Sequence, residues 1–183
     1  MRLLELHIKN FKSIRDMHIT DIEDVLILVG KNNTGKTSVL DAIRAVGGIY
    51  PLSPKDFNEK RQNIEIMVSL EISPDDLKML HRHRIVSQYK RFDVWKRDFE
   101  SKLPSYRDNV LDFVYVVNQE GKERFCDGFK KHNKYIPEVF PKIYYMDVQR
   151  DLAQIQEDLL MFQEDELLKQ MRSLSLIHIS SEL

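Results

Sequence analysis

The chain has 183 residues, of which 42% are hydrophobic and 31% are charged, and its formal net charge is −1. These values fit one globular domain with a sizeable core, and they exclude a chain-wide electrostatic argument for nucleic-acid or membrane binding. A single cysteine, Cys126, excludes an internal disulfide framework and fits a reducing compartment. No apolar run reaches the roughly 18 residues of a membrane span, so we expect a cytoplasmic location without a membrane partner.

The amino-terminal part is predicted to contain three strands and a helix. Residues 4–9 alternate between apolar and polar side chains, as a half-buried strand does, and residues 14–19 predict a second strand. Residues 25–29 are an unbroken aliphatic run, which is typical of a central strand buried on both faces. A helix is predicted over residues 36–46, and Gly47 and Gly48 end it.

The middle of the chain is predicted to alternate between strands and helices. After a loop over residues 49–62, residues 64–72 alternate as a strand. Ser73 as a cap and Pro74 at the first helical position predict a helix to about residue 81. The remaining expected elements are a helix over 88–103, a hairpin over 110–117 and 122–129, a buried strand over 143–146 and an acidic helix over 151–171.

The end of the chain departs from this pattern. Residues 173–183 lose the helical period, and they resemble either an edge strand or translated adapter read-through at the end of a truncated gene. We therefore expect residues 1–172 to form one unit and residues 173–183 to be an atypical tail.

Residues 30–37, Gly-Lys-Asn-Asn-Thr-Gly-Lys-Thr, match the phosphate-binding pattern G-x-x-x-x-G-K-[ST]. The glycines let backbone N–H groups turn inward around a β-phosphate, and the following helix adds its partial positive charge. Lys36 would reach the β- and γ-phosphates, Thr37 would offer its hydroxyl to Mg²⁺, and Ser38 would reach the α-phosphate. The candidate nucleotide-binding residues are Gly30, Asn32, Asn33, Thr34, Gly35, Lys36, Thr37 and Ser38, with ATP and Mg²⁺ as the expected cofactors.

Three segments carry a family resemblance. They are Ile8-Lys9-Asn10-Phe11-Lys12-Ser13, Asn32 inside the P-loop, and Ser38-Val39-Leu40-Asp41-Ala42-Ile43. Together they resemble the head domain of RecF- and SMC-type ATPases, which are ABC-class ATPases of DNA repair and chromosome maintenance. The later segments Pro54-Lys55-Asp56-Phe57 and Tyr144-Tyr145-Met146-Asp147 are similar to overcoming-lysogenization-defect (OLD) endonucleases.

This resemblance implies a fold and further site residues. The fold would be an α/β P-loop domain with a mixed sheet, antiparallel at its start, around the strand at 25–29. Lys12 and Ser13 would approach the nucleotide, although a plain surface turn is the alternative. Gln149 would be a Q-loop glutamine that senses Mg²⁺ and the γ-phosphate, although an exposed helix start is the alternative.

The sequence shows no Walker B strand ending in Asp-Glu, no signature motif and no carboxylate-rich Toprim nuclease domain. No catalytic residue is therefore identified. We expect the chain to be the amino-terminal half of an incomplete ATPase head, which alone binds nucleotide weakly and hydrolyses it poorly.

The leading functional hypothesis is the ATP-binding part of an OLD- or RecF-like ATPase that acts on DNA in repair or phage defence. ATP would join two heads in a homodimer, and hydrolysis would separate them. The alternatives are an ABC transporter ATPase subunit, a small-molecule or nucleoside kinase, and a non-enzymatic, nucleotide-gated interaction module.

Two further segments allow two interpretations each. Residues 78–107 contain nine Lys or Arg among aromatic residues, which indicates either a DNA-backbone contact surface or a solvated helix face over a buried aromatic core. His81 and His83 within this segment point in different directions on a helix end, which argues against a metal site. The acidic segment 147–166 could bind cations or a basic partner, or could simply keep a helix solvated.

Overall fold

The computed structural model describes residues 1–31, 35–128 and 131–145. The chain forms two compact units. The first consists of Met1–Glu23 and Leu28–Ile143, and the second includes Asp24–Ile27. The first unit is built on a six-stranded sheet in the order β2-β1-β3-β5-β4, with β6 also paired to β5. The strands are β1 (Arg2–Phe11), β2 (Ile14–Ile19), β3 (Ile64–Glu71), β4 (Tyr106–Arg107), β5 (Val110–Val117) and β6 (Glu123–Cys126). Each of these pairings is antiparallel.

The sheet has one apolar and one polar face, as its alternating sequence requires. Along β3 every second residue, from Ile64 to Leu70, is buried. In register with them, Ile8 of β1 lies opposite Ile66, and Leu6 lies opposite Val68. The strands therefore present one continuous aliphatic surface that a helix can cover.

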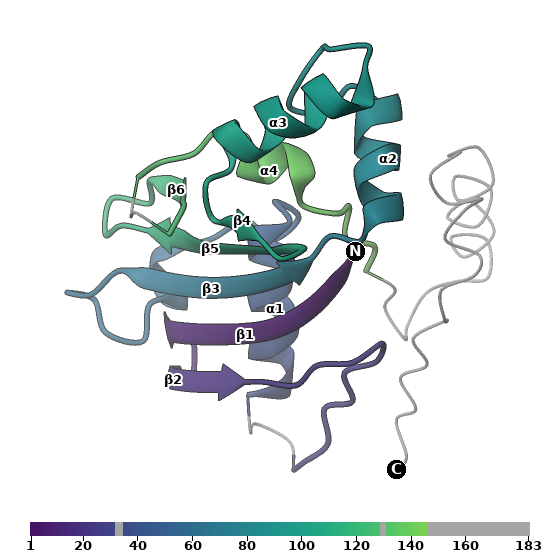
Figure 1. The fold of residues 1–183 in the computed structure, drawn as a ribbon. Coiled ribbons are helices and arrows are strands. Elements are labelled where there is room, and N and C mark those ends of the chain that lie inside the picture. The colour runs from purple at the N-terminus through teal and green to yellow at the C-terminus, as the bar shows by residue number, and fades with distance from the viewer. Residues whose placement is uncertain (32–34, 129–130, 146–183) are drawn as a thin grey trace, which may run out of the picture. The chain divides into compact units, whose positions relative to one another are not determined.

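Helix α1 (Lys36–Val46) covers that surface, and Figure 1 shows it behind β1 and β3. Its residues Val39, Ala42 and Val46 are buried. The other helices are η1 (Pro54–Asp56, a 3₁₀ turn), α2 (Pro74–Arg82), α3 (Phe92–Lys102) and α4 (Ile136–Val139). In Figure 1, α2, α3 and α4 stand beyond β5, on the side of the sheet away from β2.

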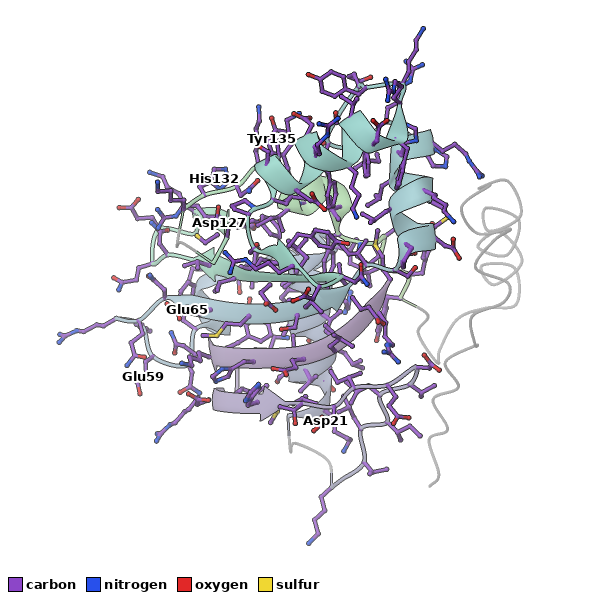
Figure 2. The ribbon with its side chains drawn as sticks, in the orientation of Figure 1. Asp21, Glu59, Glu65, Asp127, His132 and Tyr135 are labelled. Carbon is purple, nitrogen blue, oxygen red and sulfur yellow. The ribbon has the colours of Figure 1, made fainter. Side chains whose placement is uncertain are left out.

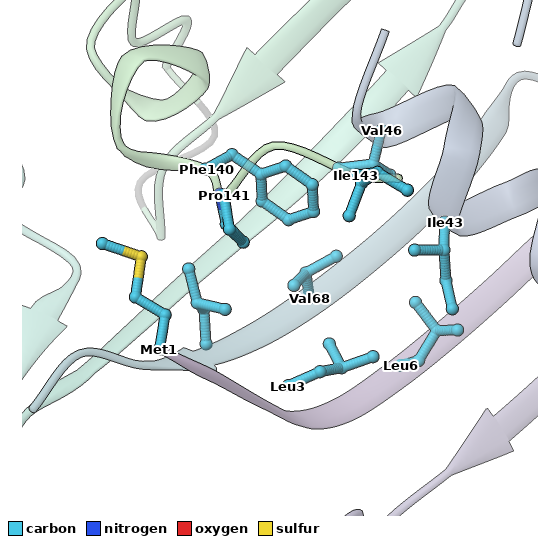
Figure 3. A pocket seen from close by; sticks show the side chains of 10 residues that line it. Met1, Leu3, Leu6, Ile43, Val46, Val68, Phe140, Pro141 and Ile143 are labelled. Carbon is cyan, nitrogen blue, oxygen red and sulfur yellow. The ribbon is translucent and has the colours of Figure 1, made fainter. Parts of the chain in front are cut away.

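A small apolar hollow lies between α1, the sheet and the segment after α4, as Figure 3 shows. Its volume is about 80 Å³. Pockets for drug-sized ligands measure about 300–1,000 Å³, so this hollow is too small to hold a nucleotide. It is lined by Leu3, Leu6, Ile43, Val46, Val68, Phe140, Pro141 and Ile143, among others.

Several sequence predictions are confirmed. The strands at 4–9, 14–19, 64–72 and 110–117 and the helix at 36–46 all form, with small differences at their ends. The start of α2 is also as predicted: Ser73 is the N-cap and its hydroxyl accepts a hydrogen bond from the Asp76 backbone, while Pro74 occupies the first turn. Periodicity and capping residues fix these elements locally.

The prediction of a central strand at residues 25–29 is wrong. These residues form no strand, and the Ile27 and Val29 side chains are 72% and 87% exposed. A strand needs hydrogen bonds to a neighbouring strand, and within residues 1–31, 35–128 and 131–145 no named pairing includes this run. Aliphatic side chains favour burial, but they do not by themselves provide the neighbouring strand that a β-strand needs.

Two other predicted elements differ. The helix expected over 88–103 begins only at Phe92, because Arg91 has the extended backbone of an N-cap, and Gln88 and Tyr89 are exposed loop residues. Residues 143–145 form no strand, and no named pairing among the described residues includes them. The short elements β4 and α4 were not expected. The predicted helix over 151–171 and the tail at 173–183 lie outside the described residues.

Candidate nucleotide-binding site

The P-loop connects Val29 to helix α1. Gly30 and Gly35 have φ angles of 151° and 93°, in the region that residues with a Cβ rarely adopt. A Cβ added at Gly35 would stand 3.5 Å from the Ser13 hydroxyl, which is an ordinary van der Waals contact, so the constraint at Gly35 comes from its φ angle. The backbone around Gly35 therefore requires glycine, as the phosphate-binding pattern predicts. Asn32, Asn33 and Thr34 lie outside the described residues.

The start of α1 is suited to an anion. Its N-cap is Gly35, which offers no side-chain hydrogen bond, and the first turn carries no acidic side chain. The first N–H groups of a helix have no partner within the helix, and the helix dipole makes this end partly positive. A phosphate of ATP fits this end of the helix chemically, since it would satisfy these donors and the dipole together.

Lys36 is the first residue of α1, and its ammonium turns back over the loop. It donates hydrogen bonds to the carbonyl oxygens of Gly30 and Lys31, the second at 2.8 Å. A phosphate at the start of α1 would compete with these carbonyls for the ammonium. Thr37 is exposed, so its hydroxyl is open to a ligand.

The donor set for Mg²⁺ is small. Among the described residues no group of three or more His, Cys, Asp or Glu side chains could hold a metal ion. Mg²⁺ commonly keeps several waters and takes only one or two protein ligands together with nucleotide phosphates. The Thr37 hydroxyl fits that arrangement. Gln149, the other predicted Mg²⁺ ligand, lies outside the described residues.

Ser13 lies beside the P-loop helix. It sits in the turn between β1 and β2, and its Oγ is 3.3 Å from Oγ of Ser38 in α1. The structure thus brings together the residue expected from family resemblance and the one expected from the P-loop pattern. The Ser13 hydroxyl also lies beside Gly35, where a phosphate cradle would need polar atoms.

Lys12, which precedes Ser13, is held differently. Its ammonium donates to the Asp41 carboxylate at 2.5 Å and lies 4.4 Å from the centre of the Tyr50 ring. Burial alone lowers the pKa of Lys12, but the hydrogen bond to Asp41 and the contact with Tyr50 outweigh it, so the pKa lies above its usual 10.5. Lys12 is therefore a charged structural anchor, and its predicted contact with a nucleotide stays a prediction.

Asp41 is the centre of this anchor, and sequence reasoning did not identify it. It is 4% exposed and also accepts a hydrogen bond from Arg44 at 2.8 Å. The missed signal was its position: Asp41 lies three residues after Ser38 and four before Ala45, both on the buried face of α1. A charged residue on a buried helix face must have partners, because an unpaired buried charge is costly.

The turn at Lys12 is also fixed through its backbone. Lys12 has a positive φ of 51°, its N–H donates to the Asp56 carbonyl at 2.7 Å, and its own carbonyl accepts from the Asn58 side chain at 2.6 Å. Asp56 is buried and accepts hydrogen bonds from Tyr50 and Ser53. Hydrogen bonds from the segment around η1 therefore stabilise the turn that contains Ser13.

Asn10, near the end of β1, also fixes the backbone of this segment. It is buried with φ of 58°, and its amide donates to the carbonyls of Glu59 and Gln62 at 3.0 and 2.8 Å. Asparagine tolerates this backbone region better than most residues with a side chain. The Asn10-Phe11-Lys12-Ser13 segment thus combines two strained residues with the side chains that stabilise them.

The chain is also similar to known families and proteins. A family model described as the AAA ATPase domain matches residues 1–175. An uncharacterized protein of Methanocaldococcus jannaschii is 27% identical over 161 residues, and the DNA replication and repair protein RecF of Shewanella oneidensis is 25% identical over 165. Each alignment covers 84% of this chain, and it covers 45% and 44% of those proteins respectively. The chain therefore spans less than half the length of the curated relatives it matches.

The fold is also similar to a solved structure from work on ATP-driven dimerization and DNA-stimulated activation of SMC ATPases. The TM-score is 0.51 with 16% identity, covering 88% of this chain and 98% of that one. At this identity the likeness shows the fold alone, and it confirms the expected α/β P-loop head with antiparallel amino-terminal strands. Among the described residues no helix has the length and apolar character of a membrane span. The chain belongs to the AAA ATPase domain family and is related to RecF.

Proposed function

We propose that this chain is the ATP-binding part of an ATPase that acts on DNA. The observation that carries the proposal is the start of α1, an uncapped helix end that carries the Lys36 ammonium and, on its first turn, the Ser38 hydroxyl in contact with Ser13. These groups offer N–H and O–H donors and positive charge to a polyphosphate, and the first turn of the helix contains no acid to repel it.

Each residue would have a distinct role. Lys36 would leave the loop carbonyls and neutralise the phosphates, and the backbone of Gly35 would approach them closely. The Thr37 hydroxyl would hold Mg²⁺, whose contribution when bound is to screen charge between the phosphate oxygens. Ser13 and Ser38 would donate to phosphate oxygens from the side.

The finer parts of the proposal concern the whole protein. The relationship to RecF supports a role in DNA repair, and the SMC-like fold supports heads that pair in an ATP-dependent homodimer. An OLD-type protein of phage defence is a narrower version of the same proposal. A nuclease domain with clustered carboxylates in the full-length protein would support that version, and a long heptad coiled coil would contradict it.

The test is a calorimetric titration with ATP and Mg²⁺. The replacement Lys36→Ala removes charge-assisted hydrogen bonds to phosphate, so we expect the affinity for ATP to fall by about 10- to 100-fold. The matched control is Lys31→Ala, which removes a lysine from the same loop while keeping the backbone carbonyl that Lys36 contacts. Wild-type affinity in the Lys36 variant, or an equal loss in both variants, would show that the site is assigned wrongly.

A further inference from the structure

The segment from the end of α2 to the start of α3, residues 81–92 and here called the α2–α3 loop, carries an unusual concentration of positive charge. Residues 81–92 contain four Lys or Arg and two His, and no acidic residue. The side chains of Arg82, Arg84, Lys90 and Arg91 are all exposed. Because the whole chain has a net charge of −1, this loop differs sharply from the average surface.

Arg91 of this loop and most basic side chains of helices α2 and α3 are neutralised by carboxylates. In the described part of the chain, by contrast, no carboxylate lies within ion-pair distance of Arg82, Arg84 or Lys90. The positive charge available to a partner is therefore concentrated in the loop and not spread along the helices. The neutralised pairs are Lys78–Asp75, Arg91–Asp93, Lys96–Glu100, Arg97–Asp93 and Lys102–Asp98.

Aromatic rings accompany these charges. Phe92, Trp95 and Phe99 form a column with ring centres 6.0 and 5.0 Å apart and interplanar angles of 17° and 27°. Trp95 and Phe99 are fully buried, which confirms the interpretation of these two residues as core. Phe92 ends the column at the surface, and the nearby Tyr89 is 52% exposed. Two partly exposed rings thus accompany the unneutralised cations.

We propose that Arg82, Arg84, Tyr89, Lys90 and Phe92 form a binding surface for single-stranded nucleic acid. Cations attract the phosphate backbone, and exposed aromatic rings stack on unpaired bases whatever their sequence. The proposal rests on the proposed function, since it names the surface through which a DNA-acting protein would hold its substrate. Within the first unit, this loop and the start of α1 lie at opposite ends (Figure 1). The two ligands therefore occupy separate sites.

Another recess of the first unit has the wrong charge for this partner. A hollow of about 320 Å³ lies on the polar face of the sheet, lined in part by Glu5, Asp112 and Asp127. These carboxylates would repel a polyanion. The sign of the charge thus favours the α2–α3 loop as the place where a phosphate backbone binds.

The experiment measures fluorescence anisotropy of a labelled oligothymidylate of about 20 nucleotides across a series of salt concentrations. The triple variant Arg82→Gln, Arg84→Gln, Lys90→Gln removes three phosphate contacts, so the slope of log affinity against log salt should fall by about 2. The control is Lys55→Gln, Lys60→Gln, Arg61→Gln, which removes the same charge from exposed side chains of the segment that contains Glu59. Figure 2 shows Glu59 away from α2 and α3. The control should keep the wild-type slope.

The aromatic contribution is tested at Tyr89. Tyr89→Ala should weaken binding roughly 5- to 100-fold, because one base loses its stacking platform. Tyr89→Phe keeps the ring and should bind as the wild type does. Circular dichroism of each variant checks that the fold is intact, which is expected because all the replaced side chains are exposed.

The outcomes separate this surface from the nucleotide site. Equal losses in the two triple variants, or no oligonucleotide binding by the wild type at low salt, would overturn the proposal even if ATP still binds. Loss of ATP binding in Lys36→Ala with unchanged oligonucleotide binding would support both sites independently. Failure of the wild type to bind ATP would contradict the proposed function, whatever the oligonucleotide result.

Discussion

The buried carboxylate of Asp41 gives the most quantitative prediction. The replacement Asp41→Asn keeps the size of the side chain but removes the charge that Lys12 and Arg44 share. The Asp41 side chain is only 6% exposed, and the two cations are about a quarter exposed. The variant therefore removes the carboxylate that lies nearest to both cations, while Lys12 keeps a longer contact of 3.9 Å with the Asp56 carboxylate.

The cost follows from that geometry. Breaking a fully buried pair costs about 3–5 kcal/mol, but the two cations here can recover part of their hydration. We therefore expect the free energy of unfolding to fall by about 2–3 kcal/mol. For a chain of this size that corresponds to a drop in Tm of roughly 5–10 °C.

The assay is urea unfolding followed by far-UV circular dichroism, with a thermal melt in parallel. Asp75→Asn is the matched control, because it also breaks a Lys pair on a helix but at an exposed site where Asp75 is 88% exposed. It should cost less than about 0.5 kcal/mol. A similar small cost for Asp41→Asn would refute the reasoning that a buried ion pair anchors the Lys12 turn.

Two further predictions concern packing and pH. In Gly47→Ala the new Cβ would stand 2.6 Å from Cγ1 of Ile143, so thermal melting should show a loss of about 1–3 kcal/mol, and the same change in an Ile143→Ala background should cost much less. Asp76 has a lowered pKa, because hydrogen bonds from the terminal ammonium and Ser73 outweigh the raising effect of burial. Its stabilisation is thus present above pH 3.8 and lost as the pH falls below it, so the unfolding free energies of wild type and Asp76→Asn should converge in acid. A difference independent of pH would contradict this assignment.

Elements whose cause is local could be predicted from the sequence. The alternation in β1 and β3 and the Ser73-Pro74 start of α2 each depend on a few neighbouring residues, and all of them form. The run at 25–29 was mispredicted because the pattern of a buried strand depends on a second strand, which the local sequence does not contain. The helix at 88–103 was extended too far because Tyr89 continues the aromatic period but lies in the loop.

For the site, too, local features could be predicted from the sequence, and contacts between separate elements could not. The glycine positions and Lys36 follow from the P-loop pattern, and the φ angles of Gly30 and Gly35 agree with it. The resemblance placed Ser13 near the nucleotide, but the sequence did not predict its contact with Ser38, because that contact joins residues from separate elements. The Lys12–Asp41 pair could not be read from spacing alone, since it depends on how α1 lies against the β1–β2 turn.

The buried aromatic column also gives this protein a built-in spectroscopic reporter. Trp95 is the single tryptophan of the chain, it is fully buried, and its indole N–H donates to the Ile85 carbonyl at 3.1 Å. Its fluorescence therefore reports the state of α3 and the loop before it, while circular dichroism averages over the whole chain. If the helix pair opens before the sheet unfolds, the two signals will separate, and local opening can be followed without a dye.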